Sequence, residues 1–275
     1  MLKGFKCILR DGKCVPFESC FKDCPAKCQP LPLLIALGRG RDVVPGRFSV
    51  TELTSPPKVA FLKRKHDYYV WPDDMIFLMF GSGFHAAIEA SAPLIKEMGM
   101  DADYIVERAG AFSMKVDTPA GTATLTGIPD LYVAPEQTLY DFKTISYYHG
   151  EKSLSEYVLS DERIEQLNIY AWARFPRCQR LVVKALVKNW NRGLRKWYVP
   201  KIITVEVPMW PLEKTATLVK QRLAILLSAE KTGEVRPCTN DECRFFNPKT
   251  SAWLRCEEYC PVNEFCNEYL ERRKK

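Results

Sequence analysis

Two aspartates and a lysine stand close together in the stretch GIPDLYVAPEQTLYDFKT, which runs from Gly127 to Thr144. Asp141 and Lys143 lie two residues apart in a segment of strand-like composition, so both side chains point to the same face of the expected strand. Asp130 precedes Asp141 by ten intervening residues. A tight turn at Pro-Glu-Gln between two neighbouring strands would therefore bring the two carboxylates side by side.

A pair of carboxylates at one edge of a sheet forms a hard-oxygen site suited to Mg²⁺ or Mn²⁺, which water and phosphate oxygens complete. Such an ion polarises a phosphoryl group and generates hydroxide for in-line attack. A neighbouring lysine orients the water and neutralises the charge that builds on the phosphate. The pattern predicts metal-dependent cleavage of nucleic acid, although Asp11-Gly12-Lys13 has the same form and the triplet alone is typical of solvated strand faces. Gly127 predicts close approach of a ligand to bare backbone.

Composition limits the classes of protein that remain. The chain has 275 residues, 47% hydrophobic and 27% charged, as in an ordinary soluble globular domain. Its 40 Lys and Arg against 33 Asp and Glu give a net charge of +7, which permits a polyanionic partner without requiring one. The longest apolar runs, PLPLLIALG and MIFLMF, are too short to span a bilayer, and the start lacks a signal-peptide core. The sequence predicts a cytoplasmic protein with no membrane partner.

Three segments differ in character. Residues 1–46 and 233–275 are irregular and rich in cysteine, whereas residues 47–232 alternate helical and strand patterns. Helical structure is expected at 49–65, with a proline break, and at 75–98, 161–175 and 211–233. Strands are expected at 102–118, at 121–133 with a Gly-Ile-Pro bend, and at 138–145, 180–189 and 196–207. That order predicts an α/β core in which helices flank a mixed sheet.

Ten of the eleven cysteines belong to the two terminal segments. In a reducing compartment such clusters are more often metal ligands than disulfides. In the first segment, Cys14, Cys20, Cys24 and Cys28 are expected to hold a metal of open identity. In the last, Cys243, Cys256, Cys260 and Cys266 form a set of four thiols, for which either Zn²⁺ or an iron–sulfur cluster is suitable, and the spacing does not decide between them.

Five motifs in order carry a resemblance to a known family. They are FSVTELTSPPKVAFLKRK, GSGFHAAIE with His85, GIPD, YDFKT, and QLNIY with Gln166 and Tyr170. Over roughly residues 47–270 the chain resembles the RecB-like branch of the PD-(D/E)xK nuclease superfamily, especially the CRISPR-associated RecB-like exonucleases and their phage relatives. The resemblance implies a restriction-endonuclease-like core, and Mg²⁺ or Mn²⁺ held by His85, Asp130, Asp141 and the carbonyl of Phe142.

The resemblance also assigns roles and a context. Lys143 would serve the attacking water, and Gln166 and Tyr170 would lie near the DNA strand and the metal. The activity would be an exonuclease on single-stranded DNA ends, with proteins of CRISPR adaptation or of phage and host recombination as partners. Relatives often carry a [4Fe–4S] cluster on three C-terminal cysteines and one N-terminal cysteine, which favours iron–sulfur over zinc here. The usual N-terminal position reads Ser55-Pro56, so either Cys243 or Cys28 must supply the fourth ligand.

Two rival interpretations remain open. A non-catalytic nucleic-acid-binding protein with structural zinc sites fits the cysteines and the charge. A sequence-specific endonuclease of the same fold fits the motifs. Divalent-dependent degradation of labelled DNA separates the first rival from the nuclease, and a circular substrate separates the second.

Overall fold

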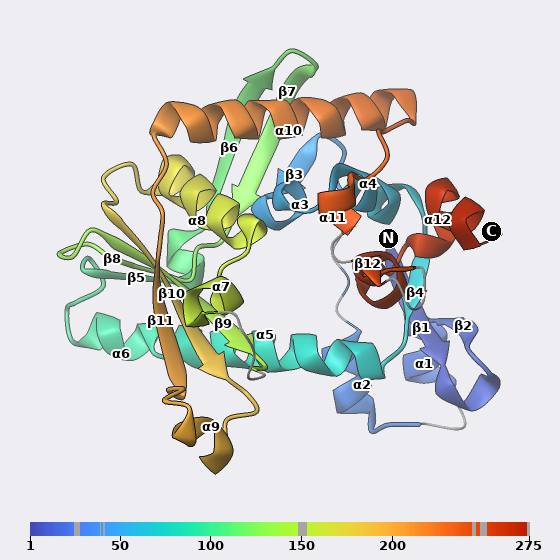
Figure 1. The fold of residues 1–275 in the computed structure, drawn as a ribbon, viewed down its shortest axis with the longest axis horizontal. Coiled ribbons are helices and arrows are strands. Elements are labelled where there is room, and N and C mark those ends of the chain that lie inside the picture. Colours follow the sequence, from blue (N-terminus) through green and yellow to red (C-terminus); the bar gives the residue numbers. More distant parts are fainter. Residues whose placement is uncertain are drawn as a thin grey trace.

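The structure is a computed structural model that describes residues 1–24, 28–38, 40, 42–147, 153–243, 246–247 and 252–273 (Figure 1). A mixed five-stranded sheet in the order β11-β10-β9-β8-β5 holds the residues singled out above. Strands β9 and β10 run parallel, whereas the other neighbours are antiparallel. Its strands are β5 (Tyr104–Val106), β8 (Leu131–Val133), β9 (Thr138–Ile145), β10 (Arg180–Val187) and β11 (Ile202–Val207).

A second sheet, in the order β3-β7-β6, lies beneath the longest helix (Figure 1). Its strands are β3 (Arg47–Ser49), β6 (Phe112–Thr118) and β7 (Gly121–Gly127). The helices on this side are α3 (Val50–Thr54), α4 (Pro57–Lys65), α7 (Leu154–Val158), α8 (Asp161–Arg174) and α10 (Leu212–Thr232). Leu125, Leu167 and Leu223, one from each of β7, α8 and α10, are fully buried in one continuous core. Since this core joins both sheets, it fixes α8 against β9.

Local sequence explains where several of these helices begin and end. Ser49 and Glu52 form a reciprocal capping box at the start of α3, and Ser160 caps α8. Gly233 ends α10 in the left-handed conformation that glycine adopts without strain.

Helix α5 (Ile76–Glu89) and the shorter α6 (Ala92–Glu97) run along the other side of the five-stranded sheet (Figure 1). Phe84 of α5 meets Phe142 of β9 edge to face, with ring centroids 5.9 Å apart. The helical stretch Asp73–Glu97 is long and apolar enough, by length and composition alone, to cross a membrane. The run MIFLMF did not by itself indicate this, because the apolar character continues beyond it through Gly, Ala, Ile and Leu residues.

The two cysteine-rich ends meet on the same part of the core. Strand β1 (Leu2–Cys7) pairs with β2 (Lys13–Pro16) on one side and, in parallel, with β4 (Tyr68–Val70) on the other. The ring of His66 stacks on Phe265 at 4.4 Å, so the last segment reaches the same place. The remaining elements are α1 (Phe17–Lys22), α2 (Leu31–Leu37), α9 (Arg192–Lys196), α11 (Asn240–Cys243), β12 (Phe246–Asn247), β13 (Ala252–Trp253) and α12 (Asn267–Arg273).

The mixed α/β architecture and the helices flanking its sheets confirm the predicted fold class at that level. Three predicted strands were wrong in extent. The strand expected at 102–118 splits into β5 and β6, which belong to different sheets, because Glu107 takes a positive φ of 44°. The strand expected at 121–133 divides into β7 and β8 at its expected Gly-Ile-Pro bend, and the strand expected at 196–207 begins only at Ile202.

Gly127 has a packing role rather than the ligand role expected from the sequence. A Cβ placed there would lie 2.7 Å from ring carbons of both Phe112 and Tyr170. The missing side chain therefore makes room for two aromatic rings that meet edge to face.

Replacing Gly127 with alanine should lower the free energy of unfolding by about 1–3 kcal/mol, because two packed rings must shift. Urea denaturation measures the change. Gly83→Ala is the matched control, since a Cβ there meets nothing within 4 Å and alanine favours the helix by up to about 1 kcal/mol. Equal stability of Gly127→Ala and the parent chain would contradict the packing role.

Candidate metal centre

Three acidic residues occupy one row across three neighbouring strands. Val106 pairs with Leu131, and Leu131 pairs with Tyr140. Continuing each register by one residue places Glu107 beside Asp130 and Asp130 beside Asp141. The backbone N–H of Glu107 donates to the carbonyl of Asp130 at 2.8 Å, which fixes the first of these neighbours. All three side chains are buried, with 7%, 7% and 2% of their surface exposed.

His85 approaches this row from α5. Its Nδ1 lies 2.9 Å from Oε1 of Glu107 and 3.5 Å from Oδ1 of Asp130. One ligand atom from each of these residues falls within 4.8 Å of the others, so the three side chains form a group able to hold a metal ion. The hydrogen bond that His85 donates to Glu107 outweighs the effect of burial and raises the pKa of His85.

The surroundings of Asp130 disfavour the charged form of its carboxyl group. Burial and the nearby charge of Asp141 raise its pKa to about 7, even though its Oδ2 accepts a 2.6 Å hydrogen bond from the N–H of Phe142. A carboxyl group in this position is half neutral near neutral pH. A divalent cation would compensate the negative charge of these carboxylates and stabilise their ionised forms.

Asp141 and Lys143 share one face of β9, as the sequence predicted. Lys143 Nζ donates to Oδ1 of Asp141 at 2.7 Å. The other oxygen, Oδ2 of Asp141, is buried and has no hydrogen-bond partner among the described residues. Burial lowers the pKa of Lys143, but the charges of Asp141 and Asp130 outweigh burial and raise it overall. The ammonium group therefore stays charged.

The donor set suits a hard divalent cation. It combines carboxylate oxygens with one imidazole, and an unsatisfied carboxylate oxygen costs free energy unless a ligand meets it. His85 and Asp130 come together as expected, whereas Asp141 adjoins Asp130 without joining the compact group of three. Phe142 contributes its N–H to Asp130, and a ligand role for its carbonyl stays a prediction.

Glu107 is the residue that sequence reasoning missed. It directly follows the apolar run Tyr104–Val106, which is a weak signal shared by many strand ends. Its role depends on the pairing of β5 with β8, and no pattern within the segment reveals that register. Asp103, which is equally close to the strand, carries the same sequence signal and lies at its opposite end.

Gln166 and Tyr170 lie on one face of α8 and bond each other, with Gln166 Nε2 3.1 Å from the Tyr170 hydroxyl. Tyr170 is buried against Phe112. This arrangement is that of a core tyrosine held by a polar neighbour. Their expected place beside a bound strand stays a prediction.

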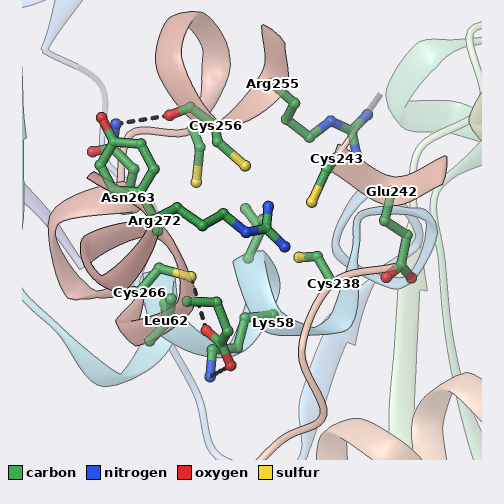
Figure 2. A pocket seen from close by; sticks show the side chains of 14 residues that line it. Lys58, Leu62, Cys238, Glu242, Cys243, Arg255, Cys256, Asn263, Cys266 and Arg272 are labelled. Atoms are coloured by element: carbon green, nitrogen blue, oxygen red, sulfur yellow. Dashed lines mark hydrogen bonds and ion pairs between the residues drawn. The ribbon is translucent and has the colours of Figure 1, made fainter. Parts of the chain in front are cut away.

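The C-terminal cysteines converge on a small cavity of about 30 Å³ (Figure 2). Figure 2 shows the side chains of Cys238, Cys243, Cys256 and Cys266 around a space into which Arg272 points, and Cys260 also lines it. Burial and the adjacent Cys243 raise the pKa of Cys256 to about 12, so the thiol keeps its proton unless a metal displaces it. Cys28 lines a different cavity, which argues against it as the fourth ligand here.

Comparisons with known proteins leave the family open. No family model and no curated protein matches the chain. A solved structure described as "Crystal structure of SSO0001" is similar at 13% identity with a TM-score of 0.49, and the match covers 86% of this chain and 92% of that one.

The raised pKa of Asp130 predicts how stability depends on pH when no divalent ion is present. The folded state keeps a proton up to about pH 7 that the unfolded chain, with an ordinary pKa of 3.8, has already released. Stability should therefore fall as pH rises from about 4 to about 7. Urea denaturation in chelator, at pH 5 and pH 8, measures the difference.

Asp130→Asn should reduce this pH dependence, because the amide carries no charge at either pH. The exposed Asp117→Asn on β6 should leave it unchanged. An equal pH dependence in parent and Asp130→Asn would show that Asp130 ionises normally in the folded protein.

Proposed function

We propose that the chain is a metal-dependent nuclease of the PD-(D/E)xK superfamily, RecB-like branch, with a restriction-endonuclease-like core. One observation carries the proposal: the buried Oδ2 of Asp141, which has no hydrogen-bond partner in the described part of the chain, stands beside Asp130, while Lys143 is held charged on the same carboxylate. A purely structural ion pair has no need of an unsatisfied oxygen next to a second buried carboxylate.

The site residues divide into two functions. Asp130 and Asp141, with His85, would hold Mg²⁺ or Mn²⁺, and Glu107 either completes this set or fixes the ring of His85 through its hydrogen bond. A bound divalent ion supplies Lewis-acid polarisation of the phosphate and a water of lowered pKa.

Lys143 acts as a charged donor rather than as a base. Because its ammonium stays protonated, it has no lone pair with which to take a proton from water. It donates to Asp141 in the resting state, and its remaining hydrogens are free to orient a water molecule and to stabilise the charge that develops on a phosphate oxygen. The proton of the attacking water must leave to another acceptor.

A basic segment supports DNA as the substrate. Residues 188–201, which we call the basic segment, contain five Lys and Arg and no Asp or Glu. All five basic side chains are exposed, and the segment also exposes Trp197 (58%) and Tyr198 (93%). Stacking aromatics among basic side chains are typical of surfaces that bind single strands.

The basic segment follows the end of β10 that lies next to Lys143 in the strand register. It begins three residues beyond Ala185, which pairs with Lys143 across β9 and β10. At the rise of a strand, that is a distance of about 10 Å along the sheet. A single strand that stacks on Trp197 or Tyr198 can therefore extend its backbone toward Lys143, which agrees with an exonuclease on single-stranded ends.

The C-terminal cavity supports an iron–sulfur cluster as an accessory to the nuclease. Lys58, Arg255 and Arg272 line it together with the cysteines and outnumber Glu242 and Glu268, and this excess of positive charge suits a centre that thiolates make anionic. Ser55 stands where the resembling nucleases have the N-terminal cysteine that serves as fourth ligand. Cys238 and Cys243 both line the cavity and can replace that cysteine, so four thiol ligands are available within the C-terminal segment. This arrangement needs no ligand from the N-terminal segment.

Lys143→Ala and Asp141→Ala should each lower cleavage of end-labelled single-stranded DNA by about 10²-fold or more, because each removes a group that acts on the reacting phosphate or its metal. The assay uses Mg²⁺ or Mn²⁺, with chelator as the blank. Lys115→Ala, an exposed lysine on β6, should retain full activity.

Near-normal cleavage by Lys143→Ala would refute the assignment of the centre. Absence of divalent-dependent cleavage by the parent chain, with DNA binding intact, would favour the non-catalytic rival. Cutting of circular single strands would favour an endonuclease.

Trp197→Ala together with Tyr198→Ala should weaken binding of oligothymidine by about tenfold or more, since a stacked base contributes about 1–3 kcal/mol. Fluorescence anisotropy in chelator measures binding without cleavage. Tyr259→Ala, which removes an aromatic ring that is 71% exposed in the C-terminal segment, is the control. Equal affinity of the double variant and the control would show that DNA binds elsewhere.

A further inference from the structure

Four cysteines of the N-terminal segment surround a cavity of their own. Cys7 ends β1, Cys20 lies in α1, and Cys24 and Cys28 follow before α2. All four line a cavity of about 190 Å³. Cys14, which the sequence placed in this set, is exposed and does not line the cavity, because the antiparallel pairing of β1 with β2 places it opposite Lys6 and one residue short of Cys7.

The four thiols are close enough to influence one another. Burial raises the pKa of Cys20, and the neighbouring Cys24, Cys28 and Cys7 raise it further. The same burial and the proximity of Cys7 raise the pKa of Cys28. Four thiols from separate points of the chain thus share one site, and each is free of a disulfide.

The surrounding core is too small to explain why this segment folds. Among the described residues it has three buried members, Phe5, Leu34 and Leu37, with Phe17 and Phe21 packed against them and a few apolar side chains of the 70–79 stretch on its other side. Small units of this size are ordinarily held by a disulfide or a bound metal in addition to their apolar core. Ligation by four thiolates supplies free energy of that kind directly to folding.

We propose that Cys7, Cys20, Cys24 and Cys28 bind a second metal centre through their thiolates, distinct from the C-terminal one. The proposal does not rest on nuclease activity. It concerns only the metal that stabilises the N-terminal segment and the cysteines that bind this metal.

The separation of the sulfur atoms selects the kind of centre. Around a tetrahedral zinc ion, bonds of about 2.3 Å place the sulfurs about 3.8 Å apart. Within the described part of the chain, no three cysteines bring their sulfurs within 4.8 Å of one another, whereas His85, Glu107 and Asp130 do so with their ligand atoms. The wider spacing and the volume of the cavity fit a polynuclear iron–sulfur cluster better than a single ion.

The test compares metal content among three forms of the full chain purified without oxygen. Iron, acid-labile sulfide and zinc are measured per chain for the parent, for Cys20→Ser with Cys24→Ser, and for the control Cys14→Ser. The double variant should lose about four irons and about four sulfides relative to the parent. The control should lose none.

The C-terminal cysteines stay intact in the double variant, so the absorbance that remains belongs to their centre and reports that the rest of the chain is folded. Unchanged metal content in the double variant overturns the N-terminal site. Loss of zinc in place of iron overturns the cluster and leaves a zinc centre on the same ligands.

Alkylation of the unaltered protein gives a second measurement if the double variant does not fold. Under native anaerobic conditions iodoacetamide should modify Cys14 rapidly, while Cys7, Cys20, Cys24 and Cys28 react at least tenfold more slowly. Removal of the metal with a chelator under reducing, anaerobic conditions should abolish that difference, as peptide mass spectrometry would record. Protection that persists after metal removal would show that burial alone shields these thiols, and would contradict the proposal.

Discussion

Burial of like charges is the constraint on which the rest of this structure depends. Glu107, Asp130 and Asp141 occupy one row of the sheet, all almost fully removed from water. Such a row destabilises the fold unless cations compensate it. Part of the compensating positive charge comes from His85, which lies on α5, and from Lys143, which lies on β9 beside Asp141. The large apolar core formed by α8, α10 and both sheets holds the row in place against its own repulsion.

The helices and the pair Asp141 and Lys143 were predictable because their signals are local. Period-two alternation places these two side chains on one face, and the apolar spacing of α8 and α10 marks their buried faces. Glu107 was not predictable, since its position depends on a backbone turn at positive φ and on the register between two strands. Long-range pairing of this kind leaves no periodic trace in either segment.

The cysteines illustrate the same limit. Their number and their grouping at the two ends indicated metal ligands, but spacing along the chain selected Cys14 where the fold places Cys7. Cys238 likewise lines the C-terminal cavity, although the set expected from the sequence began at Cys243, five residues later. Which thiols share a cavity is decided by strand pairing and by helix ends, and these bring together residues that sequence distance separates.

The stacking of His66 on Phe265 has a consequence for the order in which the molecule is completed during synthesis. The partner ring is added 199 residues after the histidine. Strand β1 cannot complete its pairing until β4 has been synthesised. The row of acidic residues is complete once β9 has been synthesised. The carboxylates are thus assembled well before the two ends close over α4 and β4. A chain that stops short of its last cysteines would carry the acidic row without the contacts that join the two ends, and its exposed apolar surface would mark it for quality control.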